Sequence, residues 1–365
     1  MLKVPLFPSK RIAFYTAKLF VLRSLAVLAA LVVVLQTLDL LGESGKILRF
    51  PGNGDAELWQ YVSLRVPQLV ARFLPFSVLL GTLITLAGLN QNSEVIAMKA
   101  AGISAHQIVA PLIVTSLIIA GFSFVFQERI VTRSTATLRA WEAVDYGEMP
   151  RESGVHNNVW VRNGDDLIFA ATVTGRGAGT QLRRVRLYER TGGTLEAIIT
   201  ANRGTPSGDG WLLSNVERFD VDATTVTKTP TLLTARGVDP TQFTLAKVDP
   251  AEQNLPTLRD SIEQMRVAGR PTAALEAGLW HKISGPLSAV LMPLLAGVAA
   301  FGLARSGQLF LRAVLGMFLG FAYFVADNFA LAMGNLGAYP PLLAAWAPFL
   351  LFLLIGETVL VRTEE

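Results

Sequence analysis

Few residues in this 365-residue chain have the types and spacing that catalysis requires. The segment Gly42–Ile47 has a glycine-rich start and a lysine, but it lacks the G-x-x-x-x-G-K-[ST] spacing of a phosphate-binding loop. The three histidines form no HExxH motif or i, i+4 pair, and cysteine is absent. No G-x-S-x-G motif occurs. The sequence therefore predicts no metal site and no cofactor on this chain, and it favours a protein that is not an enzyme.

The segment 90–102 has the composition of a short amphipathic helix, with one acid, one base and otherwise small or apolar residues. Ser93 is in the position of an N-cap, and Gly102 is in the position of a C-terminal stop. Such a helix can fit a groove in a partner, with Glu94 as the anchor for a partner arginine. The alternative is an interfacial helix without a partner.

A second group of residues combines charge with a position in or near apolar segments. Asp327 lies within an apolar stretch, where an acid is costly unless it is paired or hydrated. It could line a polar cavity or interface, or it could form a structural pair, for example with a basic residue of another chain. Basic residues near the ends of apolar stretches could meet lipid phosphates or simply anchor the chain at the interface. These are Arg65, Arg72, Arg133 and Arg139.

The elements that position these residues follow from composition. Half of the residues (51%) are apolar and only 16% are charged, against about 25% in soluble domains. The net charge is +4, and no block of five or more basic residues indicates nucleic-acid binding. Apolar stretches of about 20 residues predict a multi-span membrane protein. The six predicted spans are Phe14–Leu38, Val66–Leu89, Ala101–Gln127, the stretch between Lys282 and Arg305, Ala313–Met333 and Leu342–Val361.

Basic residues predict the orientation of these spans. Lys3, Lys10, Arg11, Lys18 and Arg23 precede or open the first span. Lys99 follows the second span, and Arg305 and Arg312 flank the loop between the fourth and fifth. All of them fall on one side of a six-span protein, which the positive-inside rule makes cytoplasmic. Both termini are then expected in the cytoplasm.

The segment between the third and fourth spans, about 128–281, is polar and rich in short alternating runs. Such runs, separated by turn signals, predict an exported all-β domain, as a sandwich, barrel or jelly roll. Helical connectors are expected on both sides, one continuing the third span and the other covering Leu258–Val267 with a cap at Thr257. The predicted domains are 1–127, 128–278 and 279–365. The predicted strands are Val159–Val161, Leu167–Phe169, Leu182–Tyr188, Leu195–Thr200, Trp211–Leu213, Val216–Val221 and Gln242–Val248.

Several of these segments together resemble the LptF/LptG (YjgP/YjgQ) family of lipopolysaccharide export permeases, and the LptG type more than LptF. The resemblance lies in Leu80–Leu83 (LGTL), Ser93–Gly102 (SEVIAMKAAG), Leu279–Ser288 (LWHKISGPLS) and Gly337–Pro341 (GAYPP). The span that contains Asp327 extends it. The order of spans and insertion agrees with the family over nearly the whole chain.

This resemblance implies a function within a bacterial inner-membrane ABC transporter. The chain would pair with an LptF-like subunit on two copies of an LptB-like ATPase, which binds ATP and Mg²⁺. Lipopolysaccharide would enter a cavity from the outer leaflet, and ATP-driven collapse would push it toward periplasmic β-jelly rolls and on to LptC and LptA. Because extraction costs about 0.8 kcal/mol per exposed methylene, a partner must supply the energy.

The resemblance also implies site residues. The segment 90–102 becomes the coupling helix, with ATPase contacts expected at Asn90, Ser93, Glu94, Ala97, Met98 and Gly102. Lipid contacts are expected at Gln36, Asp39, Lys46, Arg49, Arg72, Arg133, Arg139 and Asp327. Gln36 departs from the family, in which a lysine is common at this position. The basic contact to lipid phosphate is therefore expected at Lys46, Arg49 or Arg72 instead.

Other functions fit parts of the same sequence. A permease for another lipid or for lipoproteins would share its architecture. A membrane enzyme that modifies a lipid at the outer face would need clustered acid–base or metal residues, which the spacing does not supply. A sensor with an exported β domain would need a cytoplasmic output domain, and no segment predicts one.

Overall fold

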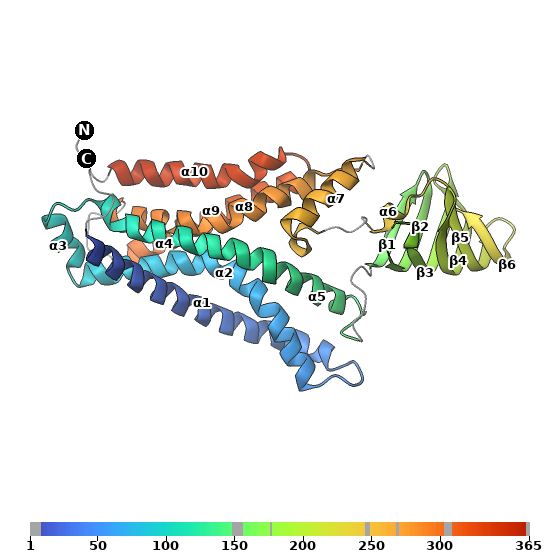
Figure 1. Ribbon diagram of the computed structural model, residues 1–365, viewed down its shortest axis with the longest axis horizontal. Helices are drawn as coiled ribbons and strands as arrows, with labels where there is room; N and C mark the ends of the chain where they lie inside the picture. The colour runs from blue at the N-terminus through green and yellow to red at the C-terminus, as the bar shows by residue number, and fades with distance from the viewer. Residues whose placement is uncertain are drawn as a thin grey trace. The chain divides into compact units, whose positions relative to one another are not determined.

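The computed structural model describes residues 9–147, 156–175, 177–244, 249–267, 270–302 and 309–362. The described chain forms two compact units, one of helices and one built around a β-sheet (Figure 1). The helical unit comprises the N-terminal part to Leu138 and the C-terminal part from Pro250, and the β unit spans Arg139–Asp249.

Six long apolar helices in the described part of the chain can cross a membrane, which confirms the predicted number of spans. The first three spans are α1 (Lys10–Ile47), α2 (Asp55–Gln91) and α4 (Ala105–Phe126), the last continuing through the π-helical turn η1 (Gln127–Val131) into α5 (Thr132–Glu142). The other three are α8 (Ala273–Gly297) with the π-helical turn η4 (Val298–Gly302), α9 (Leu309–Asn335) and α10 (Pro341–Arg362). The short helix α3 (Glu94–Ala100) lies between α2 and α4.

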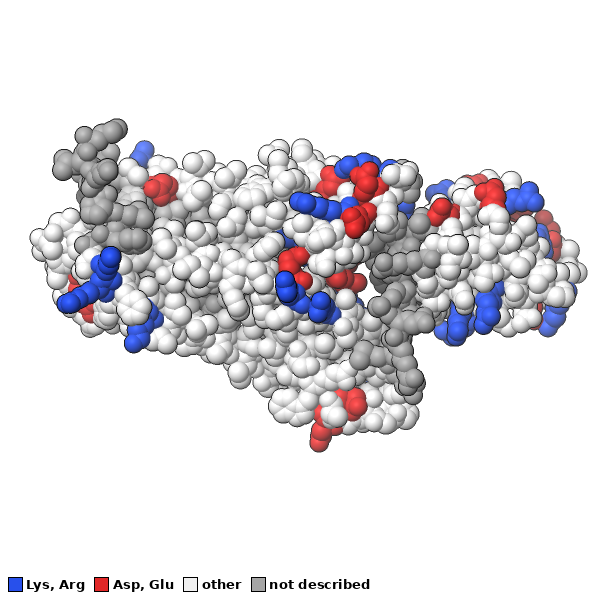
Figure 2. All heavy atoms as spheres, viewed as in Figure 1, with Lys and Arg blue, Asp and Glu red and all other residues white. Residues whose placement is uncertain are grey.

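Most of these helices extend beyond the uncharged windows that predicted them. Helix α2, for example, begins at Asp55 rather than near Val66, because acidic residues favour the first turn of a helix. The boundaries predicted at 127/128 and 278/279 fall inside continuous helical segments. The charged residues lie mainly near the ends of these long helices. Figure 2 shows this on one face, where a broad uncharged belt separates the charged side chains at the two ends.

The core of the helical unit forms around α2 and α8. Leu79, Leu83 and Leu86 of α2 pack with Leu291 and Leu295 of α8 in one buried cluster, to which α1, α3, α4, α9 and α10 also contribute. In this cluster α8 contacts α2, α4, α9 and α10 directly. Residues buried on α8 therefore lie inside the protein and not against lipid.

Helices α1 and α2 approach most closely at Gly81. A Cβ atom added there would lie 2.1 Å from Oγ of Ser24 and 2.7 Å from its Cα atom. The absence of a side chain at Gly81 thus lets the backbones of the two helices touch, as small residues do at membrane helix interfaces.

The β unit is a six-stranded antiparallel meander with strand order β1-β2-β3-β4-β5-β6 (Figure 1). The predicted all-β insertion is confirmed, and its hairpin connections join only neighbouring strands. The strands are β1 (His156–Asn163), β2 (Asp166–Thr174), β3 (Gln181–Thr191), β4 (Thr194–Ser207), β5 (Gly210–Asp220) and β6 (Thr225–Thr234), with a short 3-10 turn η2 (Gly177–Gly179).

One face of this sheet buries an apolar core. Alternate residues such as Ile168, Val185 and Ile199 point into it. The helix α6 (Pro240–Thr244) adds Phe243, whose ring meets that of Trp211 edge to face. At the edge of the sheet, Nζ of Lys228 lies 2.7 Å from Oε1 of Glu217 on the neighbouring strand, and the hydrogen bond that the ammonium group donates to this carboxylate raises the pKa of Lys228.

Three strand predictions differ from the structure. Trp211–Leu213 and Val216–Val221, predicted as two strands, lie in the single strand β5, which ends at Asp220. Gln242–Thr244 is helical, as part of α6, and the rest of the predicted strand Gln242–Val248 lies outside the described residues. The last strand is instead β6, which the sequence analysis missed. Nearly all of its side chains are exposed, so it lacks the apolar alternation that predicts a strand. Pro230 is compatible with this position because β6 is an edge strand.

The predicted connector helix is present as α7 (Leu255–Val267), preceded by the 3-10 turn η3 (Pro250–Glu252). Its cap is Asn254 and not Thr257 as predicted. The Thr257 amide donates to Oδ1 of Asn254 at 3.0 Å, and the helix begins three residues earlier than expected. Asparagine and threonine are both favoured at the N-cap, so residue type alone could not decide between Asn254 and Thr257.

Candidate functional site

The predicted coupling segment 90–102 divides into two parts in the structure. Asn90 belongs to the last turn of α2, and the short helix α3 begins only at Glu94. Ser93 does not cap α3 with its side chain as predicted, because its backbone is left-handed (φ 60°) and its hydroxyl makes no cap bond. Its carbonyl nevertheless accepts the first helical hydrogen bond, from the Ala97 amide.

The end of α3 is as predicted. Gly102 has a φ of +79°, its amide donates to the Lys99 carbonyl, and the next amide, of Ile103, donates to the Met98 carbonyl. This pair of bonds is a Schellman motif, which requires a residue that tolerates positive φ. The direction of the chain as it enters α4 is therefore fixed at Gly102.

Helix α3 is attached to the bundle by one face. Val95 and Met98 are buried in the core of the helical unit, whereas Ile96 is 62% exposed and Ala97 is also exposed. Figure 1 places α3 at the end of the bundle where α1 begins and α10 ends. Val95 and Met98 therefore hold α3 against the other helices, while its opposite face stays exposed.

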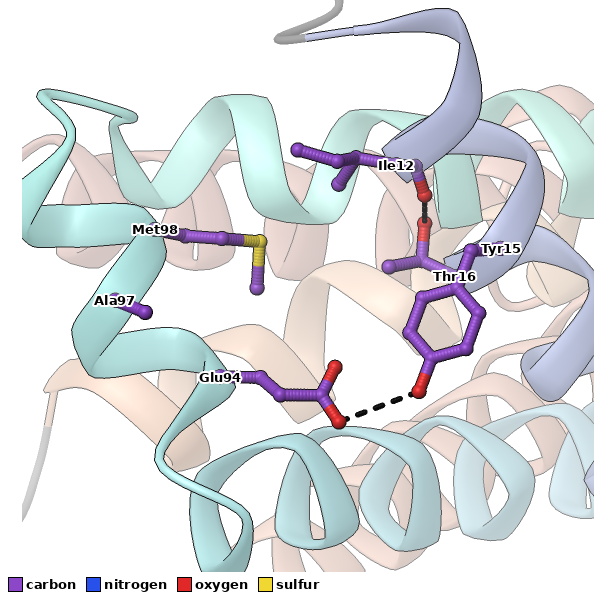
Figure 3. A pocket seen from close by; sticks show the side chains of 6 residues that line it. All are labelled: Ile12, Tyr15, Thr16, Glu94, Ala97 and Met98. Carbon is purple, nitrogen blue, oxygen red and sulfur yellow. Dashed lines mark hydrogen bonds between the residues drawn. The ribbon is translucent and has the colours of Figure 1, made fainter.

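Glu94 lies at the edge of a small pocket between α3 and the start of α1 (Figure 3). The pocket has a volume of about 230 Å³ and is lined by Ile12, Tyr15, Thr16, Glu94, Ala97 and Met98. The Tyr15 hydroxyl donates to Oε1 of Glu94 at 3.2 Å. Tyr15 was not predicted, since a contact 79 residues away in sequence leaves no local signal.

A polar cluster joins α1 and α2 near the other end of these helices. Arg65 donates from Nε and Nη2 to both oxygens of Asp39, at 3.0 and 2.9 Å, and the Tyr61 hydroxyl donates to Oδ2 at 2.5 Å. Gln36, one turn earlier on α1, is buried, and its amide atoms have no hydrogen-bond partner among the described residues. Asp39 is thus neutralised within the chain by a bidentate pair.

The basic residues predicted to contact lipid differ in whether they form ion pairs within the chain. Lys46 pairs with Glu43 at 2.8 Å, and Arg139 pairs with Asp249. Arg49, Arg72 and Arg133 are exposed, and the described residues provide no ion-pair partner for any of them. These three arginines keep their charge available for an anionic ligand.

Asp327 has a partner in the same chain. Its Oδ2 atom lies 3.6 Å from Nε2 of His281, which is on α8, and its side chain is mostly buried between α8 and α9. The structure therefore places Asp327 in the interior of the helical unit with a polar neighbour, and the sequence analysis did not associate it with His281.

The most buried ion pair among the described residues was not predicted. Nζ of Lys282 lies 2.8 Å from Oε1 of Glu128, and the two side chains are only 5% and 14% exposed. The second oxygen of Glu128 accepts from the Leu255 amide at 2.6 Å, so this carboxylate joins η1, α8 and the start of α7. The sequence did contain one signal for this pair. Lys282 stands at the start of the fourth predicted span, and a charge near the membrane interior requires a partner.

No group of three or more potential metal-ligating side chains occurs within the described ranges of the chain. The polar side chains instead pair between helices or face outward at the two ends of the bundle. The fold defines a polytopic membrane protein with an inserted all-β domain and a short helix, α3, between its second and third spans.

Comparison with known proteins identifies the family. The model of the family described as "Lipopolysaccharide export system permease LptF/LptG" matches residues 14–362, and the chain belongs to this family. The chain is 24% identical to the lipopolysaccharide export system permease protein LptG of Escherichia coli K12 over 351 residues, which cover 94% of each chain. It is 26% identical to LptG of Haemophilus influenzae over 327 residues, covering 87% of this chain and 90% of the relative.

Proposed function

We propose that this chain is a permease subunit that extracts lipopolysaccharide from the inner membrane, with ATP hydrolysed by a separate subunit. The observation that carries the proposal is the match to the export permease family along residues 14–362, together with six spans and an inserted all-β domain. The relatives named LptG cover nearly all of the chain, which favours the LptG role over that of LptF.

The physical requirements of lipid export support the same function. Removing several acyl chains from a bilayer costs about 0.8 kcal/mol per exposed methylene, so the process needs an external energy source. The chain has no phosphate-binding loop. Helix α3 offers a surface for a soluble ATPase, and the proposed contacts are Glu94, Ala97 and the exposed residues around them. Asn90, Ser93 and Gly102 flank this surface, and buried Met98 anchors it.

The orientation follows from the charges at the α3 end. Lys10 and Arg11 open α1, Lys99 lies on α3, and Arg362 ends α10 at the same end of the bundle. By the positive-inside rule this end faces the cytoplasm, where an ATPase can reach α3. The β unit is inserted after the third span and therefore lies in the periplasm, and both termini lie in the cytoplasm.

At the periplasmic end, we assign the lipid phosphates to the exposed arginines Arg49, Arg72 and Arg133. The arginine guanidinium binds phosphate in a bidentate manner and keeps its charge. Gln36 can contribute only neutral hydrogen bonds, and Asp39 serves to hold Arg65. The remaining predicted contacts, Lys46, Arg139 and Asp327, have acidic or histidine partners within the chain.

The proposed partners are an LptF-like second permease subunit, an LptB-like ATPase dimer that binds ATP and Mg²⁺, and LptC and LptA as periplasmic acceptors. The experiment that tests the function is reconstitution of the purified complex in proteoliposomes containing lipopolysaccharide. We expect ATP-dependent transfer of lipopolysaccharide to soluble LptA. In the control reactions, a phospholipid or a triacylated lipoprotein replaces lipopolysaccharide as the substrate.

Transfer of lipoprotein but not of lipopolysaccharide would show that the chain belongs to another exporter. Chemical modification of the lipid without ATP would show that it is a membrane enzyme. A chain that purifies alone from its own membranes, under conditions that preserve ABC transporters, would contradict the requirement for an ATPase partner.

A further inference from the structure

The sheet of the β unit has an irregularity that crosses four neighbouring strands, β2 to β5 (Figure 1). In a regular strand a single outward residue separates two inward ones, but on β3 both Leu182 and Val185 lie in the buried core and two exposed residues stand between them. Arg184 and Asn215 have positive φ angles of 50° and 55°, which shift the alternation on β3 and β5. The same spacing of buried residues occurs at Ala170 and Val173 on β2, Ala201 and Gly204 on β4, and Leu213 and Val216 on β5.

The irregularity gives the outer face of the sheet a band of polar side chains that includes no acid. On β3, β4 and β5 this arginine band consists of Arg183, Arg184, Asn202, Arg203, Ser214 and Asn215. Arg183 and Arg203 are direct partners across β3 and β4, and like charges placed opposite each other destabilise a sheet. None of the three arginines forms an ion pair with another described residue. An anion bound between Arg183 and Arg203 would remove their repulsion.

An aromatic group lies beside the arginine band on the same face. Trp160 on β1 pairs in register with Phe169 on β2, which in turn pairs with Arg186 on β3. The Trp160 ring stacks on that of Tyr188 at 5.9 Å and contacts the Phe169 ring at 4.9 Å. Trp160 is nevertheless 53% exposed. Its two aromatic neighbours therefore hold the indole in place, and the exposed part of its surface remains open to a ligand.

We propose that this outer face, formed by the arginine band and Trp160, binds the phosphorylated oligosaccharide of the transported lipid. The planar guanidinium groups bind phosphate in a bidentate manner. The amides of Asn202 and Asn215 and the hydroxyl of Ser214 can exchange hydrogen bonds with sugar hydroxyls. The face of an indole is negative and packs against the C–H groups of a sugar ring. The inference rests on the proposed function, and it assigns the sugar part of lipopolysaccharide to the β unit.

Two observations favour a saccharide over an anionic membrane surface. Uncharged hydrogen-bonding side chains stand among the arginines, and they match the directional hydroxyls of a sugar better than a layer of phospholipid headgroups. Trp160 also covers part of Phe169 and Tyr188, so that one ring of the three projects. Binding to a membrane surface requires a wider apolar face than one projecting indole provides.

The test uses the full chain, assembled with its second permease subunit in nanodiscs of phosphatidylcholine. The probe is the fluorescently labelled oligosaccharide of lipopolysaccharide after chemical removal of its acyl chains, and the measured quantity is its Kd. We expect Arg183→Gln/Arg203→Gln to weaken binding about tenfold, as the loss of hydrogen bonds to a charged group does. Trp160→Ala should weaken it about three- to tenfold. Removal of the phosphates from the probe should have the same effect as the double variant.

Arg218→Gln is the matched control, because Arg218 pairs with Glu189 at 2.8 Å and its partner in register, Ile199, belongs to the inner face of the sheet. It should leave the Kd unchanged. An equal Kd for the double variant and the wild type would overturn the inference, and so would equal weakening by Arg218→Gln, which would indicate an effect of net charge.

Two further comparisons separate the remaining explanations. Arginine-dependent binding of phosphatidylglycerol vesicles, without binding of the oligosaccharide, would assign the face to a membrane surface and overturn the inference. Transfer of lipopolysaccharide in proteoliposomes by a wild-type complex that does not bind the oligosaccharide would also overturn it, while the proposed function would stand. Arginine-dependent binding of the oligosaccharide by a complex that transfers no lipopolysaccharide would support the saccharide site and contradict the proposed function.

Discussion

The buried Lys282–Glu128 pair makes a quantitative prediction. Replacing Lys282 by Met removes the ammonium group but keeps the length of the side chain, and it leaves the Glu128 carboxylate buried. Breaking a buried ion pair on one side costs about 3–5 kcal/mol. Because Oε2 of Glu128 still accepts from the Leu255 amide at 2.6 Å, we expect the lower part of this range, about 3 kcal/mol.

The chain offers a matched control for this experiment. Lys46 and Glu43 are separated by the same N–O distance, 2.8 Å, but Lys46 is 62% exposed. Exposed pairs of this kind contribute about 0–1 kcal/mol, so Lys46→Met should leave the stability of the chain nearly unchanged. At about 2–4 °C per kcal/mol for a medium-sized domain, Lys282→Met should lower the apparent melting temperature by about 6–12 °C.

The assay is thermal unfolding of the full chain in mild detergent, followed by tryptophan fluorescence. The double variant Glu128→Gln/Lys282→Met should recover most of the loss, because a neutral amide can still accept from Leu255. Equal melting temperatures for Lys282→Met and Lys46→Met would refute the argument that burial makes the pair strong. Failure of the double variant to recover would show that the ammonium contributes through packing and not by compensating charge.

Three further predictions concern other parts of the chain. Glu94→Arg should reduce retention of the ATPase during purification by more than tenfold while the chain stays inserted, and normal retention would contradict the coupling role of α3. Gly81→Ala should destabilise the α1–α2 contact by about 1–3 kcal/mol, whereas Gly121→Ala, where no atom lies within 4 Å of the new Cβ, should be neutral in the same melting assay. Arg133→Glu reverses an exposed charge on α5 that is assigned to lipid phosphate, so it should lower lipopolysaccharide release in proteoliposomes without loss of assembly. Arg139→Glu is its control, because Arg139 is paired with Asp249, and equal effects of the two substitutions would contradict the assignment to Arg133.

The number of spans and the all-β insertion could be predicted because both depend on local patterns. A helix that crosses a bilayer must be apolar over about 20 residues, and this property is visible in any window of the sequence. The alternation that predicted β1–β5 is equally local. Strand β6 could not be predicted in this way, since it lies at the sheet edge with nearly all of its side chains exposed and pairs only through its backbone.

The candidate site was predictable only in part. The helix-forming segment and its stop at Gly102 follow from residue types, and the backbone confirms that stop. Ser93 stands at the N-cap position as its residue type predicts. Its hydroxyl makes no cap bond, because the turn that connects α2 to α3 puts its backbone in the left-handed conformation. The Tyr15 contact depended on how α1 packs beside α3, which no pattern in either segment specifies.

The class of protein, the order of its elements and the acid on α3 can be inferred from the sequence alone, because hydropathy and composition act over short stretches of chain. Which charged side chains are paired depends instead on how the helices pack. This packing pairs Asp39 with Arg65, Glu128 with Lys282 across 154 residues, and Glu94 with Tyr15. Charged side chains in a low-dielectric interior must find partners, and helix packing determines which partner lies within reach.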